Sequence, residues 1–197
     1  DLFGQMRVTD QKLAIDRLLA PVVPVDILCI GLNYKEHATE TGATVPANPM
    51  VFMKPSTALN NPGDPIYIPR RSEQIDYEAE LAVIIGKTGK YIPRDRAMEY
   101  VFGYTCANDV SARDWQRNRD LGGGQFTRGK GFDGFCPLGP WIVTRDELPD
   151  PGNLRIRTLL NGQVMQDNTT ADMIFDVPAL IESLSSTMTL RAGSIIL

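Results

Sequence analysis

Hydrophobic and polar positions alternate in short stretches along the 197-residue chain, and this pattern predicts many short strands. Apolar runs of strand length fall at 26–32 and 77–86, and another strand is predicted at 50–54. Residues 154–160 and 164–166 flank Asn161-Gly162, a pair typical of a type I′ turn. We therefore expect a β-hairpin there.

Helices are expected to be few and short. Periodic apolar positions predict a helix over 11–19, ended by prolines, and one to two helical turns over 34–40 before a glycine. Two more helices are predicted over 94–101 and 176–184, the second with Pro178 in its first turn. No strand–helix rhythm is visible, so the predicted fold class is α+β, mainly β.

Composition and charge exclude several classes of protein. The net charge is −4 and no cluster of Lys and Arg is present, so neither nucleic acid nor an anionic membrane surface is an expected partner. No apolar run approaches the roughly 18 residues of a membrane-spanning helix. Cys29, Cys106 and Cys136 stand in apolar surroundings and are expected to be buried, reduced thiols. A cytoplasmic protein is expected, or a mitochondrial one if the source is eukaryotic.

Three acidic residues are candidate ligands of a hard metal ion. Glu78 and Glu80 lie one residue apart in a predicted strand, so their side chains share a face, and Asp109 follows the stretch 102–105. Burying like charges is costly unless a cation compensates them, and Mg²⁺ or Ca²⁺ prefers carboxylate oxygens. The alternative is that both glutamates form the solvated face of an amphipathic strand.

A second group of polar residues is suited to substrate binding. Asp109, Arg113 and Gln116 fall at i, i+4 and i+7, on one side of the chain if the segment is helical. Arg113 would then bind a carboxylate and Gln116 would donate to a carbonyl. The simpler alternative is an intrahelical Asp–Arg pair beside a surface amide.

The only histidine, His37, stands three residues before Glu40. An imidazole that titrates near neutral pH and is oriented by a carboxylate is suited to act as a general base on water. The alternative is a partly exposed helix histidine with an accidental acidic neighbour.

A glycine-rich stretch matches a phosphate-binding loop incompletely. Residues 124–130 read G-x-x-x-x-G-K, but Gly131 stands where Ser or Thr would bind magnesium, so nucleotide binding is not expected. We expect instead a flexible loop that delivers Lys130 to an active site. The glycines at 122–124 beside Arg117 and Arg119 are candidates for shaping a distal pocket.

Six motifs follow one another along the chain. They are GLNY (31–34) with His37 and Glu40, FMKP (52–55), DYEAEL (76–81), NDVSARD (108–114), GKGFD (129–133) and CPLGP (136–140). From about residue 25 onwards the chain thereby resembles the short-chain branch of the fumarylacetoacetate hydrolase family. That branch includes acylpyruvate hydrolases, oxaloacetate decarboxylases or tautomerases, and hydroxyheptadienedioate isomerases.

The resemblance implies a rolled β-sheet catalytic domain over 25–197, an N-terminal appendage of helix and linker over 1–24, and a homodimer. It also implies a magnesium ion, replaceable by Mn²⁺ or Ca²⁺, on the residues matching Glu78, Glu80 and Asp109. In the family the chain continues past the residues matching 193–197 into further strands. We therefore expect a natural protein that extends beyond Leu197.

The resemblance also assigns roles to the other candidates. The residues matching His37 and Glu40 lie on a lid that orders over the substrate. Those matching Arg113, Gln116 and Lys130 contact the substrate or polarise its oxygens, which makes Lys130 both a catalytic and a substrate-binding candidate.

The expected function is magnesium-dependent turnover of a 2-oxo or 2,4-dioxo acid. The first expectation is C–C bond hydrolysis of an acylpyruvate-type substrate, with His37 activating water and Lys130 stabilising the oxyanion. The same enolate would serve an oxaloacetate decarboxylase or tautomerase, or a hydroxyheptadienedioate isomerase. A family member that binds a metabolite without turnover is a further alternative.

Overall fold

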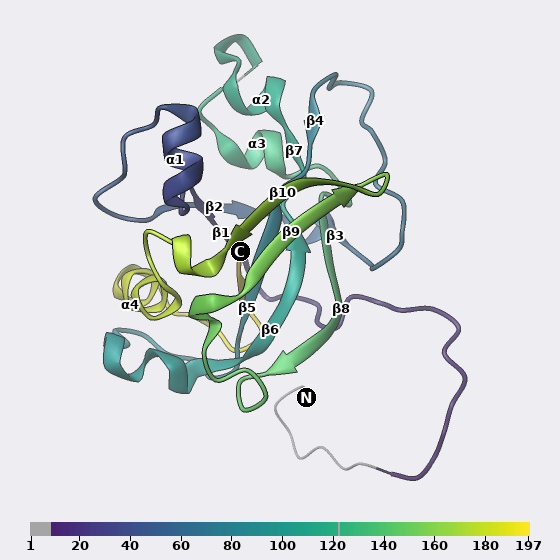
Figure 1. The fold of residues 1–197 in the computed structure, drawn as a ribbon, viewed down its shortest axis with the longest axis vertical. Helices are drawn as coiled ribbons and strands as arrows, with labels where there is room; N and C mark the ends of the chain where they lie inside the picture. The colour runs from purple at the N-terminus through teal and green to yellow at the C-terminus, as the bar shows by residue number, and fades with distance from the viewer. Residues whose placement is uncertain (1–8, 122) are drawn as a thin grey trace.

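The fold is known from a computed structural model, which describes residues 9–121 and 123–197. A seven-stranded sheet forms its centre, in the order β2-β1-β11-β5-β6-β8-β3 (Figure 1). Its strands are β1 (Ile27–Gly31), β2 (Met50–Lys54), β3 (Leu59–Asn60), β5 (Ala79–Ile85), β6 (Val101–Asn108), β8 (Cys136–Thr144) and β11 (Ile195–Ile196). Strands β1 and β11 pair in parallel, as do β3 and β8, and the other pairs are antiparallel. Two small sheets complete the strands: β4 (Ile75–Asp76) with β7 (Ser111–Ala112), and β9 (Arg155–Leu160) with β10 (Gln163–Thr169).

The centre of the main sheet is buried on both faces. Successive side chains of a strand point to opposite sides, and here each side enters a different core. One core takes Leu28, Ile30, Val83 and Ile85, and the other takes Ile27, Cys29, Ala82 and Ile84. This double burial explains why β1 and β5 read as continuous apolar runs, and it confirms the strands predicted there.

The described residues form four α-helices outside the sheet: α1 (Lys35–Thr41), α2 (Arg113–Arg117), α3 (Phe126–Lys130) and α4 (Val177–Thr187). The longest, α4, begins where Asp176 Oδ1 accepts a hydrogen bond from Ala179 N at 2.9 Å. Its buried face includes Leu180 and Leu184, which pack in the core that also contains Leu28 and Val83. The helix predicted over 176–184 is therefore confirmed.

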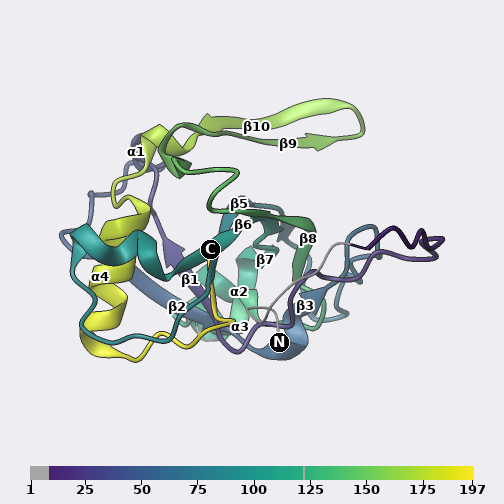
Figure 2. The same ribbon diagram turned by 90° about the horizontal axis from the view of Figure 1, so that it is seen from below.

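The β9–β10 hairpin forms a separate layer beside the main sheet (Figure 2). Asn161 and Gly162 have φ angles of 52° and 79°, both positive, as a type I′ turn requires. The hairpin predicted from this pair is confirmed.

Two predictions about local structure are wrong. Residues 11–19 form no helix: the segment has no regular secondary structure, and Leu13 and Ile15 are exposed. A nine-residue helix is marginal in water, and no core receives its apolar stripe. The helix predicted over 94–101, by contrast, is confirmed, because Arg94–Tyr100 forms a 3₁₀ helix. Cys29 and Cys136 are buried free thiols, but Cys106 is exposed, because β6 continues beyond the core that buries Tyr104.

Other predictions remain open. The division at residue 24 stays a prediction, and residues 1–8 of the proposed appendage lie outside the described residues. Within the described part of the chain no helix combines the length and apolarity needed to cross a membrane.

Candidate active site

One cavity of about 470 Å³ brings together side chains from distant parts of the sequence. Its walls come from α1, β2, β5, α2, α3 and the β9–β10 hairpin. It is lined by seven of the eight predicted site residues: His37, Glu40, Glu78, Glu80, Arg113, Gln116 and Lys130. The eighth, Asp109, is buried and contacts Lys130 from behind the wall.

The antiparallel pairing of β5 and β6 places the three acidic candidates together. Ala79 pairs with Asn108 in this register, and Asp109 N donates to Glu78 O at 2.8 Å. Glu78 and Glu80 are half-buried and line the cavity, so the alternative of a solvated strand face is wrong.

Buried cations surround two of these carboxylates. Lys130 Nζ bonds to Glu78 Oε2 and lies 2.7 Å from Asp109 Oδ2. Arg113 Nη2 lies 2.7 Å from Glu78 Oε1. Burial alone would lower the pKa of Lys130, but the charges of Asp109 and Glu78 outweigh it and raise that pKa above its ordinary value. Lys130 is therefore held as an ammonium that can donate hydrogen bonds into the cavity.

Behind this wall lies Lys54, a residue of the FMKP motif to which sequence reasoning gave no role. Its fully buried ammonium donates to Val110 O at 3.1 Å, Lys130 O at 2.6 Å and Phe135 O at 2.9 Å. It also lies 2.6 Å from Asp109 Oδ1. The signal that could have identified it is a lysine that ends an apolar strand directly before a proline.

The third carboxylate, Glu80, is different. Among the described residues no hydrogen bond or ion pair engages its side chain. Burial, and next the charges of Glu78 and Asp109, raise the pKa of Glu80 well above its usual range. A half-buried carboxylate beside two others is the arrangement that a bound cation stabilises.

The donor set therefore fits magnesium in its chemistry, because all three candidates supply the oxygen ligands that this ion prefers. The described side chains do not form a metal cage as they stand: no three His, Cys, Asp or Glu groups lie at ligand spacing. The Lys130 ammonium instead lies between Glu78 and Asp109. The magnesium site stays a prediction.

The segment that carries Arg113 is arranged differently from the prediction. Asp109 lies before the helix, which begins at Arg113, so the two residues do not share a helix face and do not form an intrahelical pair. Arg113 binds Asp76 and Glu78 instead, with Nε 2.8 Å from Asp76 Oδ2, and its Nη1 donates to Gln116 Oε1 at 3.0 Å. The pairing of β4 with β7, which sets Asp76 opposite Ser111, brings Arg113 to these partners.

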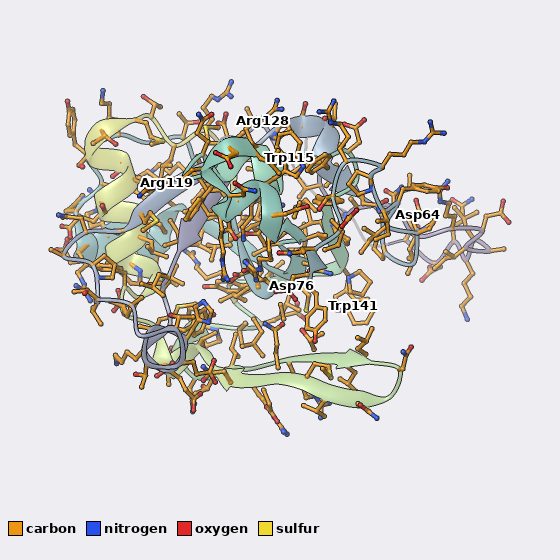
Figure 3. All side chains as sticks on the ribbon, turned by 90° about the horizontal axis from the view of Figure 1, so that it is seen from above. Asp64, Asp76, Trp115, Arg119, Arg128 and Trp141 are labelled. Carbon is orange, nitrogen blue, oxygen red and sulfur yellow. The ribbon has the colours of Figure 1, made fainter. Side chains whose placement is uncertain are left out.

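Lys130 reaches the cavity from the end of the short helix α3 and not from a flexible loop. Helices α2 and α3 pack closely, since a Cβ atom at Gly129 would lie 2.7 Å from the backbone nitrogen of Gln116. Arg128 of α3 stacks over the Trp115 ring of α2, 5.1 Å from its centroid (Figure 3). The glycine of the GKGFD motif thus permits the contact that positions Lys130.

His37 and Glu40 lie on α1 and line the same cavity, although both side chains are exposed. No hydrogen bond joins them in the described structure. Ala38 is the one buried residue of this helix, which ends at Gly42 with a positive φ of 62°. The helix ending at this glycine confirms the prediction for 34–40.

Arg117 and the hairpin also contribute to the cavity. Arg117 lines it with an exposed guanidinium, whereas Arg119 does not. Gln166 and Asn168 of β10 form part of the opposite wall, which no sequence motif indicated. Of the suggested distal glycines, Gly122 lies outside the described residues, and Gly123 packs against the backbone of Arg117 and Asn118.

The family model "Fumarylacetoacetate (FAA) hydrolase C-terminal" matches residues 26–197. A relative from Xenopus laevis, a mitochondrial oxaloacetate tautomerase, is 48% identical over 181 residues, which are 91% of this chain and 56% of that protein. The chain thus spans little more than half of that relative's length. An uncharacterized protein of Archaeoglobus fulgidus is 48% identical over 199 residues, which cover 100% of this chain and 77% of that protein.

Solved structures agree with this match. A 2-hydroxyhepta-2,4-diene-1,7-dioate isomerase from Mycobacterium marinum has a TM-score of 0.86 and 42% identity, over 99% of this chain and 71% of that one. A 5-carboxymethyl-2-hydroxymuconate delta-isomerase from Mycobacterium smegmatis has a TM-score of 0.82 and 46% identity, over 92% of this chain and 69% of that one. The rolled, mainly β fold is therefore confirmed. The chain belongs to the fumarylacetoacetate hydrolase family.

Proposed function

We propose that this protein catalyses keto–enol chemistry on a small dicarboxylic 2-oxo acid with the help of a bound divalent cation, and that tautomerisation or isomerisation is its reaction. One observation carries the proposal: a single cavity joins a cluster of carboxylates and buried cations to an exposed imidazole. The relatives named as an oxaloacetate tautomerase and as dioate or muconate isomerases support it.

The reacting end of the substrate would lie against the part of the cavity formed by Glu78 and Glu80 with the buried Asp109, which we call the acidic wall. Glu78, Glu80 and Asp109 would hold magnesium, which when bound acts as a Lewis acid on the 2-oxo carbonyl. The Lys130 ammonium would donate a hydrogen bond to the oxygen on which negative charge develops. Arg113, held in place by Asp76 and Glu78, adds positive charge at this end.

The proton moves at the carbon next to the carbonyl. His37 is the one imidazole of the chain and lines the cavity. It would take the proton from the enol oxygen and deliver one to C3 in a tautomerisation, or take a proton from C3 and deliver it to a conjugated carbon in an isomerisation. Glu40, three residues further along α1, would orient the ring and stabilise its charged form.

The distal carboxylate of the substrate would meet Arg117. The other two cations of the cavity wall, Arg113 and Lys130, are already paired with protein carboxylates. Arg117 has no ion pair or hydrogen bond of its side chain among the described residues. It is therefore the cation with a charge to offer a second carboxylate.

C–C hydrolysis of an acylpyruvate is a second candidate, because the same His37 could deprotonate a water molecule instead of carbon. The two reactions share the enolate and differ in whether water attacks a distal carbonyl. The same cavity serves either reaction, and turnover of matched substrates separates them.

The test uses the full-length protein with magnesium and two substrates, the enol form of oxaloacetate and acetylpyruvate. We expect enol-to-ketone conversion of oxaloacetate, lost by about 10²–10⁴-fold in His37→Ala, the usual worth of a general base. Glu80→Gln should lose the magnesium-dependent rate and the rise in melting temperature that magnesium gives the wild type. Arg117→Gln should lose selectivity for 2-oxoglutarate over 2-oxopentanoate as competing ligands.

Two exposed positions off the cavity serve as controls, Glu73→Gln and Arg119→Gln, and both should behave as wild type. Cleavage of acetylpyruvate without tautomerisation would replace the proposed reaction by the hydrolytic one. No acceleration of either substrate, or an equal response of Glu80→Gln and wild type to magnesium, would refute the proposal.

A further inference from the structure

A second, small cavity adjoins the main cavity at Glu80. Its volume is about 20 Å³, and it shares Ile30, Asn33, Tyr34 and Glu80 with the main cavity. The rest of its lining is apolar and comes largely from the core beneath α4, with Leu81, Val83 and Leu180 among its residues. A water molecule needs about 10–15 Å³ of such space, so this cavity has room for one.

The hydroxyl of Tyr34 is buried and has no hydrogen-bond partner among the described residues. Its pKa is raised, first by burial and then by the charge of Glu80. A buried hydroxyl without a partner destabilises the folded state, so a ligand for it is expected on energetic grounds. The neighbouring Glu80 carboxylate likewise has no hydrogen bond in the described structure.

The backbone holds Tyr34 in this position. Tyr34 pairs with Met173 in an isolated antiparallel bridge, and its carbonyl accepts the first hydrogen bond of α1 from Ala38 N at 3.0 Å. The next residue back, Asn33, has both ends of its amide engaged by the backbone of Phe175, at 2.9 and 3.0 Å. Asn33 is therefore satisfied, and Tyr34 and Glu80 are the polar side chains of the small cavity that still need a partner.

We propose that one ordered water in the small cavity links the Tyr34 hydroxyl to the Glu80 carboxylate, and that Tyr34 thereby positions Glu80 for a divalent cation. Tyr34 is a positioning residue here, because it acts through Glu80. The inference rests on the proposed function only in the identity of the cation; the water link itself stands on the cavity and its two polar groups.

Tyr104 provides a matched control within the same molecule. Its hydroxyl is also buried without a hydrogen-bond partner among the described residues, but it lies in the core beneath α4 and lines neither cavity. Replacing either tyrosine by phenylalanine removes one buried, unpaired hydroxyl. Both variants should therefore fold alike, with similar melting temperatures in the absence of magnesium.

The experiment measures magnesium affinity by calorimetry in the full-length wild type, Tyr34→Phe and Tyr104→Phe. We expect the dissociation constant to rise about 10–100-fold in Tyr34→Phe, the usual effect of losing a group that orients a metal ligand, and to stay unchanged in Tyr104→Phe. High-resolution crystal structures should show the water within hydrogen-bond distance of Tyr34 Oη and Glu80 in the wild type, and should show it displaced in Tyr34→Phe.

Equal magnesium affinity in Tyr34→Phe and wild type, or equal losses in both variants, would overturn the positioning role. Electron density without a water at this place would overturn the link. If the wild type binds no magnesium, the proposed metal site fails and with it the role of Tyr34 toward the cation. The density in the cavity then still decides whether the water link exists.

Discussion

At the scale of single residues, the arrangement around Asp109 depends on one buried lysine. Lys54 forms an ion pair with Asp109 Oδ1, and its ammonium also donates to the carbonyl of Lys130, whose own ammonium pairs with Asp109 Oδ2. A charge without exposure to water is tolerated only when it is paired and hydrogen-bonded, and Lys54 satisfies both conditions. Lys54 thus holds the acidic wall and α3 in one arrangement.

This predicts a large stability loss for Lys54→Met. The change keeps the aliphatic length but leaves Asp109 Oδ1 and three backbone carbonyls without the Lys54 ammonium, and losing one partner of a buried ion pair costs about 3–5 kcal/mol. Urea denaturation should show this loss in the free energy of unfolding. Lys35→Met, at an exposed position of α1, should change it by less than about 0.5 kcal/mol. Equal effects of the two changes would mean that Lys54 does not hold the wall.

At the scale of elements, the cavity lies between the well-buried main sheet and helix α1, which buries little of its own surface. Strand β5 carries Glu80 and is buried over most of its length, whereas α1 buries one residue, Ala38. The N-terminal end of α1 is tied to the rest of the chain where Glu36 N donates to Asp172 Oδ2 at 2.9 Å. Local opening is easiest where few apolar contacts resist it.

Hydrogen exchange should therefore distinguish α1 from α4. We predict that amides of 35–41 exchange fast in the free protein and at least about tenfold more slowly with magnesium and oxalate, because a ligand that binds the closed form reduces opening. Amides in the buried turns of α4 should exchange equally slowly in both conditions and serve as the internal reference. Equally slow exchange of α1 with and without the ligand would show that it is not a lid.

At the scale of the whole molecule, two strands from opposite ends of the matched region pair with each other inside the main sheet. Strand β11 pairs in parallel with β1, and Asp26, just before β1, binds the turn that leads into β11. Its carboxylate lies 3.1 Å from Arg191 Nε and 2.7 Å from Arg191 Nη2, and it accepts from Ser194 Oγ at 2.9 Å. The hydrogen bonds from Arg191 lower the pKa of Asp26, although its burial opposes them.

The contacts of Asp26 with Arg191 and Ser194 predict that the difference in unfolding free energy between Asp26→Asn and the wild type depends on pH. Because the pKa is lower in the folded state than the ordinary 3.8, the stabilisation is complete above that value and is lost as the pH falls through the folded pKa. The partners are partly exposed, so we expect a loss of about 1 kcal/mol at pH 7. Urea unfolding at pH 7 and pH 3 checks it: the difference between variant and wild type should shrink at pH 3. A difference that is constant with pH would refute the ionic account, and the exposed Asp133→Asn is the control.

The sequence by itself determined the features that depend on local physics. Apolar runs predicted β1 and β5, the Asn161-Gly162 pair predicted the hairpin, and Asp176 with Pro178 predicted α4, because strand burial, turn chirality and helix capping act over a few residues. The motifs also predicted seven of the residues that line the cavity.

Tertiary structure alone decided which side chains and segments contact one another. Asp109 has the partners Lys54 from β2 and Lys130 from α3, and the pairing of β4 with β7 brings Arg113 to Asp76 and Glu78, where helical spacing had suggested an Asp109–Arg113 pair. The apolar stripe of 11–19 formed no helix because no core receives it. Tyr34 came into the site through its bridge to Met173, and the hairpin wall through long-range contacts such as the hydrogen bond from Ala79 N to Gln166 Oε1, which no local pattern encodes. Pairing across such distances is set by the packing of the whole sheet.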